Sequence, residues 1–371
     1  MPGYDLARFV AVFGVVVVDM VLQVAFDFSK PGMIEDGPFL LAWGQRMWWG
    51  RASAMLAVVA GAGLGLMFKP TDDAETLSRK RRTVLKRALF LWVVGHLWHS
   101  STLWEFSILH YYAFFLAFGV LFARTRPRAL LGTAIGVMAV GVAYQLLYGE
   151  PPSTDLDVGW EDPLRMWELA YWNPVRQLTE VLLDGQYPVF PWLAFILIGM
   201  WVVRIGVDRV EVRRRVLGGS LFVMGVSFLA WWSVRQLTDD GTALFLTTIN
   251  RDGSMPLYVL TAGCQAVVFL CLSMSVAAMW PSRRWMAPLI ATGQMTFTIY
   301  IVHILVGGGS RQGLFDLVGF PPGEGLVAGW TRVAVFLSVA ITACHLWKKR
   351  FGRGPLEALM RRCSDGRPAN R

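Results

Sequence analysis

The chain has 371 residues, of which 55% are apolar and only 16% are charged, and its mean hydropathy is +0.46. Soluble domains carry about 25% charged residues, so this composition excludes a soluble globular protein. The net charge of +9 does not indicate nucleic-acid binding, because the basic residues form short clusters between apolar runs, the pattern that orients membrane proteins.

Apolar runs long enough to cross a bilayer recur along the whole chain. A transmembrane helix needs about 20 mostly apolar residues. Such runs occur at 6–26, 47–68, 84–104, 106–124, 128–148, 188–207, 214–237, 256–280, 285–306 and 326–347. We therefore predict an all-α, multi-pass helical membrane protein with about ten transmembrane helices, forming a single transmembrane domain over residues 1–371.

The connecting segments predict the orientation of these helices. Most of the 35 Lys and Arg residues lie in alternate connections, such as "SRKRR" after the second run and "RTRPR" after the fourth. Because Lys and Arg mark cytoplasmic loops, both termini are expected to be cytoplasmic, with a basic cytoplasmic tail at 348–371. We expect the plasma membrane of a bacterium, with the lipid bilayer as the main partner.

One long connection, residues 149–187, lies on the predicted outer face. It is acidic and rich in Trp and Pro, and residues 161–184 have Leu, Met and Trp at helical spacing. This pattern predicts an interfacial helix or lid, although a surface connector fits equally well.

Ionisable residues inside the apolar runs fall at the predicted outer level. Asp19 lies in the first run, His96 and His99 lie one turn apart in the third, His110 lies in the fourth, and His303 lies near the end of the ninth. A single histidine in a helix is more often a packing residue, and Asp19 can also form a structural ion pair. The convergence of five such groups, each costly in hydrocarbon, predicts a polar cavity that opens to the outside.

These five residues are our candidate catalytic groups, and other polar or aromatic residues accompany them. The candidate substrate-binding residues are Arg51, Glu105, Trp92, Tyr111, Tyr300, Gln265 and Arg8. No Cys/His spacing typical of zinc occurs, and we expect no metal. The G-x-x-x-G pairs at Gly61/Gly65 and Gly132/Gly136 predict close helix packing.

Several motifs resemble a known family. They are "DLARFVAVFGVVVVDM" (5–20), "GRASAMLAVVAGAGLGL" (50–66), "RALFLWVVGHLWHSSTLWEFSILHYYAFFLAFG" (87–119), "DGQYPVFPWLAFILIGMWVVR" (184–204), "GQMTFTIYIVHI" (293–304) and "GPLEALMRR" (354–362). Together they resemble the transmembrane acyltransferase superfamily, in its YeiB-like and heparan-α-glucosaminide N-acetyltransferase-like branches. The resemblance implies a multi-pass scaffold and acyl transfer.

The chain departs from this family at two places. Asp19 stands where the YeiB-like and heparan branches usually have Asn and where related polysaccharide O-acyltransferases have the catalytic His. No His occurs in 27–46, where the heparan enzyme carries its active histidine. The base of an acyltransferase must then be one of the four outer histidines, His96, His99, His110 or His303.

Three functions remain open from the sequence. The first is acyl transfer from a cytoplasmic acyl-CoA to a hydroxyl or amine acceptor, with an outer His as base and Asp19 orienting it. The second is a membrane-bound terpene cyclase without a cofactor, with Asp19 as general acid and aromatic residues stabilising a carbocation. The third is a transporter of lipids or small molecules. The sequence predicts neither the substrate nor the oligomeric state.

Overall fold

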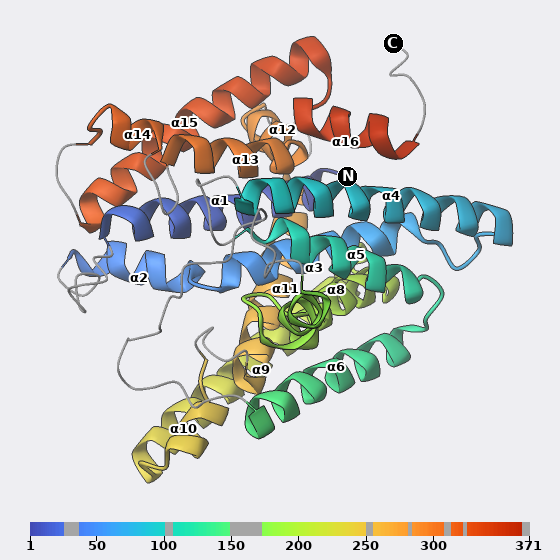
Figure 1. The fold of residues 1–371 in the computed structure, drawn as a ribbon, viewed down its shortest axis with the longest axis vertical. Helices are drawn as coiled ribbons and strands as arrows, with labels where there is room; N and C mark the ends of the chain where they lie inside the picture. The colour runs from blue at the N-terminus through green and yellow to red at the C-terminus, as the bar shows by residue number, and fades with distance from the viewer. Residues whose placement is uncertain are drawn as a thin grey trace. The chain divides into compact units, whose positions relative to one another are not determined.

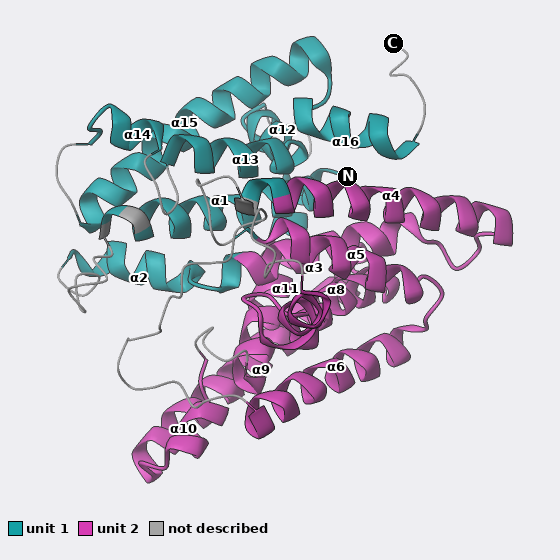
Figure 2. Ribbon diagram, viewed as in Figure 1, with its two compact units in different colours: residues 1–52, 97–107, 273–371 teal, residues 53–96, 108–272 magenta. Residues whose placement is uncertain are grey.

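Every regular element in the described part of the chain is a helix, as the sequence predicts. The computed structural model describes residues 1–25, 37–100, 107–148, 173–249, 255–280, 284–307, 313–321 and 325–365 (Figure 1). The chain divides into two compact units that are interleaved in the sequence, so neither is a contiguous segment (Figure 2). Unit 1 comprises Met1–Ala52, Leu97–Ser107 and Ser273–Arg371, and unit 2 comprises Ser53–His96 and Ile108–Leu272.

Unit 1 is built around its first helix. Its helices are α1 (Pro2–Ala25), α2 (Phe39–Trp48), α12 (Met286–Gln294), α13 (Thr296–Gly307), α14 (Leu314–Leu317), α15 (Leu326–Phe351) and α16 (Pro355–Asp365). Helix α1 packs against α2, α12, α13 and α15. Glycines of the partner helices allow close approach to α1: a Cβ at Gly293 of α12 would lie 1.9 Å from the carbonyl oxygen of Asp5, and one at Gly329 of α15 would lie 2.8 Å from Cα of Val21.

Unit 2 has α8 at its centre. Its elements are α3 (Arg51–Met67), most of α4 (Ala74–Ser100), α5 (Leu109–Leu121), α6 (Pro127–Tyr148), α7 (Pro174–Thr179), a π-helical turn at Glu180–Asp184, α8 (Val189–Arg204), α9 (Val210–Leu237), α10 (Gly241–Leu246) and most of α11 (Pro256–Met279). Helix α8 packs against α5, α6 and the π-helical turn. It is buried on several faces, as a helix that is apolar all round should be.

The two G-x-x-x-G pairs differ in how closely they pack against other helices. Gly61 and Gly65 of α3 pack against α8, where a Cβ at Gly61 would lie 2.1 Å from the carbonyl oxygen of Ile196. The packing predicted there is confirmed. Among the described residues a Cβ at Gly132 or Gly136 of α6 would meet nothing within 4 Å, so the predicted close packing is not seen there for that pair.

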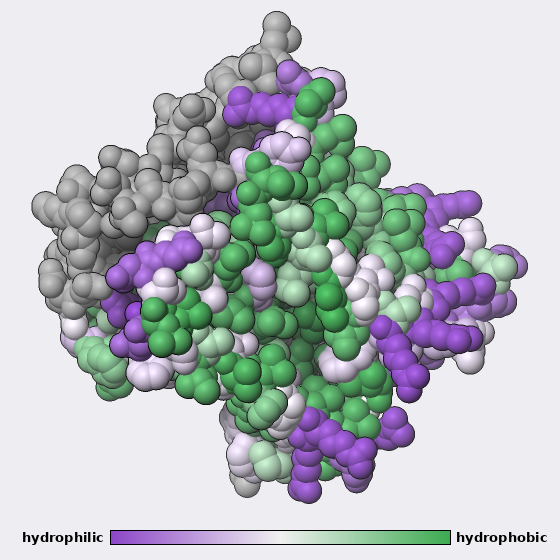
Figure 3. All heavy atoms as spheres, turned by 90° about the horizontal axis from the view of Figure 1, so that it is seen from below, coloured by the Kyte–Doolittle hydropathy of each residue, from purple (hydrophilic) through white to green (hydrophobic). Residues whose placement is uncertain are grey.

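Four helices have the length and composition to cross a membrane: α6, α9, α11 and α15. Three bent pairs, α2 with α3, the α7–π segment with α8, and α12 with α13, raise this number to as many as seven among the described residues. Large apolar side chains such as Phe222 and Trp232 of α9 are exposed, and Figure 3 shows a face covered mainly by apolar residues, with hydrophilic residues gathered toward its margins. The chain is a multi-pass helical membrane protein; ten spans and cytoplasmic termini stay predictions.

The bends correct two of the predicted spans. The run 285–306 is broken at Met295, and its two helices differ in direction by 85°. The run 47–68 begins as a helix only at Arg51, because α2 ends at Trp48 and Gly50 has a positive φ of 68°. Apolar composition gave no sign of either break.

Helix ends agree with simple capping chemistry. Asp73 accepts a hydrogen bond from the backbone N–H of Thr76 at 2.7 Å, which caps α4. Asn173 accepts from Val175 and Arg176 and, with Pro174 next, starts α7. Residues 174–184 are helical; residues 149–172 lie outside the described part, and the interfacial helix or lid stays a prediction.

Candidate active site

Asp19 of α1 and His303 of α13 form a hydrogen-bonded pair inside unit 1. Asp19 Oδ2 lies 2.9 Å from His303 Nε2. The side chain of His303 is 1% exposed and that of Asp19 is 18% exposed. The two residues are 284 positions apart, so their contact depends on the packing of α1 against α13.

The second nitrogen of His303 limits where the protons can lie. Nδ1 is 3.3 Å from the backbone carbonyl oxygen of Ile299, and because a carbonyl only accepts, Nδ1 must carry the hydrogen. Nε2 and Asp19 Oδ2 face each other at hydrogen-bond distance, so one proton between them joins the two side chains.

Asp19 is the member of the pair that retains an unused acceptor. Its Oδ1 has no hydrogen-bond partner among the described residues, whereas both nitrogens of His303 are engaged. The edge of Tyr300 packs against the imidazole, with ring centroids 5.3 Å apart, and further restrains it. The carboxylate is therefore the more accessible group of the pair, and which of the two side chains acts as a base stays a prediction.

A buried arginine holds the end of the helix that carries His303. Arg332 of α15 forms an ion pair with Asp316 at 2.7 Å and donates to the carbonyl oxygen of Gly307, the last residue of α13. A cation at the C-terminus of a helix also meets the negative end of the helix dipole. Sequence reasoning did not predict this contact.

The start of α13 is fixed by the C-terminal helix. Glu357 of α16 accepts hydrogen bonds from the backbone N–H of Thr298 at 3.0 Å and from its hydroxyl at 2.6 Å. This carboxylate sits at the N-terminus of α13, where negative charge is favourable. Both ends of α13 are thus restrained by charged side chains, which explains how a short helix can position His303.

Arg8, a predicted substrate-binding residue, is bonded within the protein. Its Nη1 donates to Asp5 Oδ1 at 2.9 Å, and Gln294 Nε2 donates to Asp5 Oδ2 at 2.8 Å. The Asp5/Arg8 motif and the "GQMT" motif therefore meet, with Gly293 against the backbone of Asp5. These contacts give the two motifs a packing role, and binding by Arg8 stays a prediction.

A second polar cluster lies in unit 2. The rings of His96 and His110 are 5.4 Å apart, and the rings of His110 and Tyr111 are 4.0 Å apart. His96 Nδ1 donates to the carbonyl oxygen of Trp92, whose ring lies 4.4 Å from the imidazole. Trp92 therefore packs against a predicted catalytic histidine.

The segment after α7 is hydrogen-bonded to Tyr111 of this cluster. The Tyr111 hydroxyl donates to Glu180 Oε1 at 3.1 Å and accepts from the backbone N–H of Gln186 at 3.2 Å. At Gly185 a Cβ would lie 2.5 Å from the same hydroxyl. Sequence reasoning missed Glu180, because nothing in its spacing separates it from the other acids of 149–187.

We expect Tyr111→Phe to destabilise the protein. The change leaves the N–H of Gln186 and the Glu180 carboxylate without this hydroxyl in a buried place, which typically costs about 1–3 kcal/mol. Tyr144→Phe is the matched control, since Tyr144 makes the corresponding bond to Asp184 at an exposed position. The thermal unfolding midpoint in detergent is measured for both variants. Equal shifts would show that the buried hydrogen bond stabilises the protein no more than the exposed one.

The remaining predicted residues do not join a described contact with Asp19 or His303. Glu105 and the side chain of His99 lie outside the described part. Arg51 begins α3, and Gln265 is buried in α11. The Asp19–His303 pair and the His96–His110 cluster belong to different units, so the single outer cavity stays a prediction. Among the described residues, no three His, Cys, Asp or Glu side chains form a metal-binding group.

Fold and site together define a class: a multi-pass helical membrane protein with an acid–imidazole pair buried between two helices. Comparison with protein-family models then shows to which family the chain belongs. The family model described as heparan-alpha-glucosaminide N-acetyltransferase, catalytic, matches residues 1–238, so the chain belongs to this family of membrane N-acetyltransferase-like proteins. A second model, described as a protein of unknown function (DUF418), matches residues 202–367. Neither the curated proteins nor the solved structures searched contain a significant match.

Proposed function

We propose that the protein transfers an acyl group from a CoA-type donor to a hydroxyl or amine acceptor, with Asp19 and His303 as its catalytic pair. The observation that supports this best is the 2.9 Å contact between Asp19 and His303 in a chain that belongs to the N-acetyltransferase-like family. Two charged or ionisable groups brought together inside a membrane helix bundle are costly without a function.

Asp19 acts as the base in this proposal. The acceptor hydroxyl or amine gives its proton to the Asp19–His303 pair while its oxygen or nitrogen attacks the thioester carbonyl carbon. The carbon–sulfur bond then breaks, and the shared proton passes to the departing thiolate. The products are the acylated acceptor and free CoA, so atoms and charge balance.

His303 acts as the positioning residue. Its Nδ1–H is held by the carbonyl oxygen of Ile299, so Nε2 always faces Asp19. Such an arrangement fixes the ring and stabilises the charge that develops on its partner, the logic of acid–histidine pairs in other enzymes. Burial of the ring to 1% exposure keeps water from replacing Asp19 as its partner.

Two further expectations accompany this proposal. The acceptor is reached from the outer face of the plasma membrane of a bacterium, because the predicted orientation places Asp19 and His303 in the outer halves of their spans. The donor binds from the cytoplasmic side, where the basic loops lie.

The alternative functions have less support. Neither matched family is described as a terpene cyclase, and Asp19 is paired with an imidazole, whereas an isolated general acid would need apolar surroundings. No observation in the described part favours transport over acyl transfer.

The test is a direct assay with the purified protein in lipid nanodiscs. Acetyl-CoA and longer acyl-CoAs are offered with a panel of sugar, amino-sugar and lipid hydroxyl acceptors, and release of free CoA thiol is followed together with product mass. A product heavier than its acceptor by the acyl group supports the proposal. Failure of every donor to release thiol, with folded protein and all acceptors present, overturns it.

A parallel test identifies the acceptor. Lipid and small-molecule extracts are compared by mass spectrometry between cells that express the wild type and cells that express Asp19→Asn. A species that gains an acyl mass only with the wild type names the acceptor. A species of unchanged mass but altered retention would point to isomerisation instead.

A further inference from the structure

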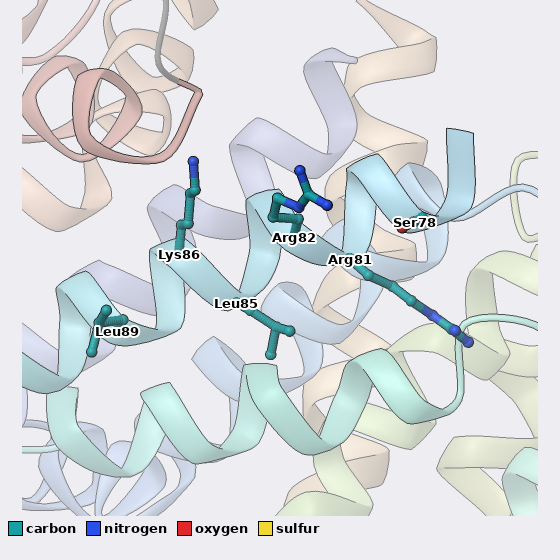
Figure 4. Close-up of a pocket in the computed structure, with 6 residues that line it drawn as sticks. All are labelled: Ser78, Arg81, Arg82, Leu85, Lys86 and Leu89. Carbon is teal, nitrogen blue, oxygen red and sulfur yellow. The ribbon is translucent and has the colours of Figure 1, made fainter. Parts of the chain in front are cut away.

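A basic and apolar stripe runs along the first half of α4 in unit 2. It borders a shallow hollow of about 430 Å³ that is lined by Ser78, Arg81, Arg82, Leu85, Lys86 and Leu89 (Figure 4). Residues three and four apart share a helix face, so these six side chains form one continuous strip. In Figure 4 Arg82 and Lys86 extend upward from α4, whereas Leu85 and Arg81 extend toward its lower side.

The cations of this strip lack anionic partners within the described protein. Arg81, Arg82 and Lys86 form no ion pair or side-chain hydrogen bond there, and Nε of Arg81 is shielded from solvent without an acceptor. The neighbouring acid is already used: Lys80 bonds Asp72 at 2.6 Å, and this hydrogen bond lowers the pKa of Asp72. Three adjacent cations are therefore available to an external anion.

The floor of the hollow is apolar. Leu85 is 46% exposed and Leu89 is 61% exposed, and Val93, one turn further along α4, is 42% exposed. Ser78 and Val93 are separated by about 22 Å along the helix axis at about 1.5 Å per residue. The strip thus changes from basic to apolar over a distance comparable with one leaflet of a bilayer, whose hydrocarbon half is about 15 Å thick.

We propose that this strip binds an anionic phospholipid. The phosphate lies between Arg81 and the Arg82–Lys86 side, with the Ser78 hydroxyl as a further donor, and an acyl chain covers Leu85 and Leu89. Guanidinium groups suit phosphate because they donate two parallel hydrogen bonds. A free phosphate or nucleotide offers the same anion but leaves both leucines in water, so the apolar floor favours a lipid. This site is separate from Asp19 and His303 and does not rest on the proposed acyl transfer.

Native mass spectrometry of delipidated protein tests the site. Phosphatidylglycerol and phosphatidylcholine are titrated into wild type and into the triple variant R81Q/R82Q/K86Q. Each Lys or Arg near anionic lipid contributes about 1 kcal/mol, so three losses weaken phosphatidylglycerol binding by about 100-fold. Phosphatidylcholine binding stays unchanged. The single variant R82Q, whose side chain is exposed, gives a smaller loss in the same direction if the triple variant unfolds.

Two comparisons can overturn the proposal. The charge-matched variant R128Q/R214Q/R215Q removes three exposed cations elsewhere in unit 2. If it loses as much phosphatidylglycerol binding as the triple variant, the loss reflects net charge alone and no specific site exists at the strip. Free CoA is added in a second arm. Binding of CoA that the triple variant loses, with phosphatidylglycerol binding intact, would assign the cations to a soluble phosphate ligand and reject the lipid.

Discussion

Asp19→Asn is expected to lower acyl transfer by about 100- to 10,000-fold, the range that a positioned acid or base contributes. Asparagine has the shape of aspartate and can still bond to His303 Nε2, but its amide cannot take a proton from the acceptor. The measurement is the turnover number at saturating donor and acceptor. The loss falls on turnover more than on KM, because the change removes proton transfer and leaves binding in place.

His303 provides an internal check on the same prediction. His303→Gln is expected to give a similarly large loss, and the double variant D19N/H303Q is expected to be hardly worse than either single variant, because the two residues act as one unit. Additive losses would mean that the contact at 2.9 Å has no role in the reaction.

The control for these variants is an aspartate with a structural role only. Asp365 forms an ion pair with Arg361, four residues away on α16, and accepts a hydrogen bond from Ser364; its side chain is 21% exposed and that of Arg361 is 51% exposed. Ion pairs near the surface contribute about 0–1 kcal/mol, so Asp365→Asn lowers stability by no more than this and leaves turnover unchanged. If Asp19→Asn keeps full turnover while His96→Gln or His110→Gln abolishes it, the catalytic base lies in the unit 2 cluster and the proposal is wrong.

The helical class of this protein could be predicted from composition, because a chain with long apolar runs and few charges has one stable form in a bilayer. Within the described residues, each of the ten apolar runs falls on a helix or a helix pair. The breaks at Met295 and between Trp48 and Arg51 could not be predicted from hydropathy, since a bend between apolar helices leaves it unchanged. At the first of these breaks the Glu357 carboxylate accepts a hydrogen bond at the start of α13, a contact made across 59 residues of sequence, and at the second Gly50 has a positive φ.

The candidate site could be predicted only in part. Asp19 and His303 stood out because ionisable residues are rare in apolar runs. Their pairing did not, since it depends on the direction in which α13 leaves the bend at Met295. Glu180 and Asp316 were missed for a different reason: both lie outside the apolar runs, where acids are unremarkable, and only the contacts with Tyr111 and Arg332 distinguish them.

Alanine in place of a glycine between α3 and α8 is expected to destabilise the protein strongly. A Cβ at Gly199 would lie 2.0 Å from the carbonyl oxygen of Val58, and one at Gly61 would lie 2.1 Å from that of Ile196. Both obstacles are backbone atoms, which cannot rotate away as a side chain can. Gly199→Ala must therefore push the helices apart, and overpacking of this kind costs about 1–3 kcal/mol or more. The measurement is the thermal unfolding midpoint in detergent.

Gly136→Ala on α6 is the matched control, because the same methyl group would meet no described residue within 4 Å. There the substitution only restricts the unfolded backbone and favours the helix, which stabilises by about 0.5–1 kcal/mol. The two variants should therefore shift the midpoint in opposite directions, although both glycines lie in apolar helices. Equal shifts would show that α3 and α8 do not approach as closely as described. Opposite signs would show that a glycine in a small-residue motif matters for stability only where another helix packs against it. The sequence of a single helix does not reveal whether such a neighbour is present.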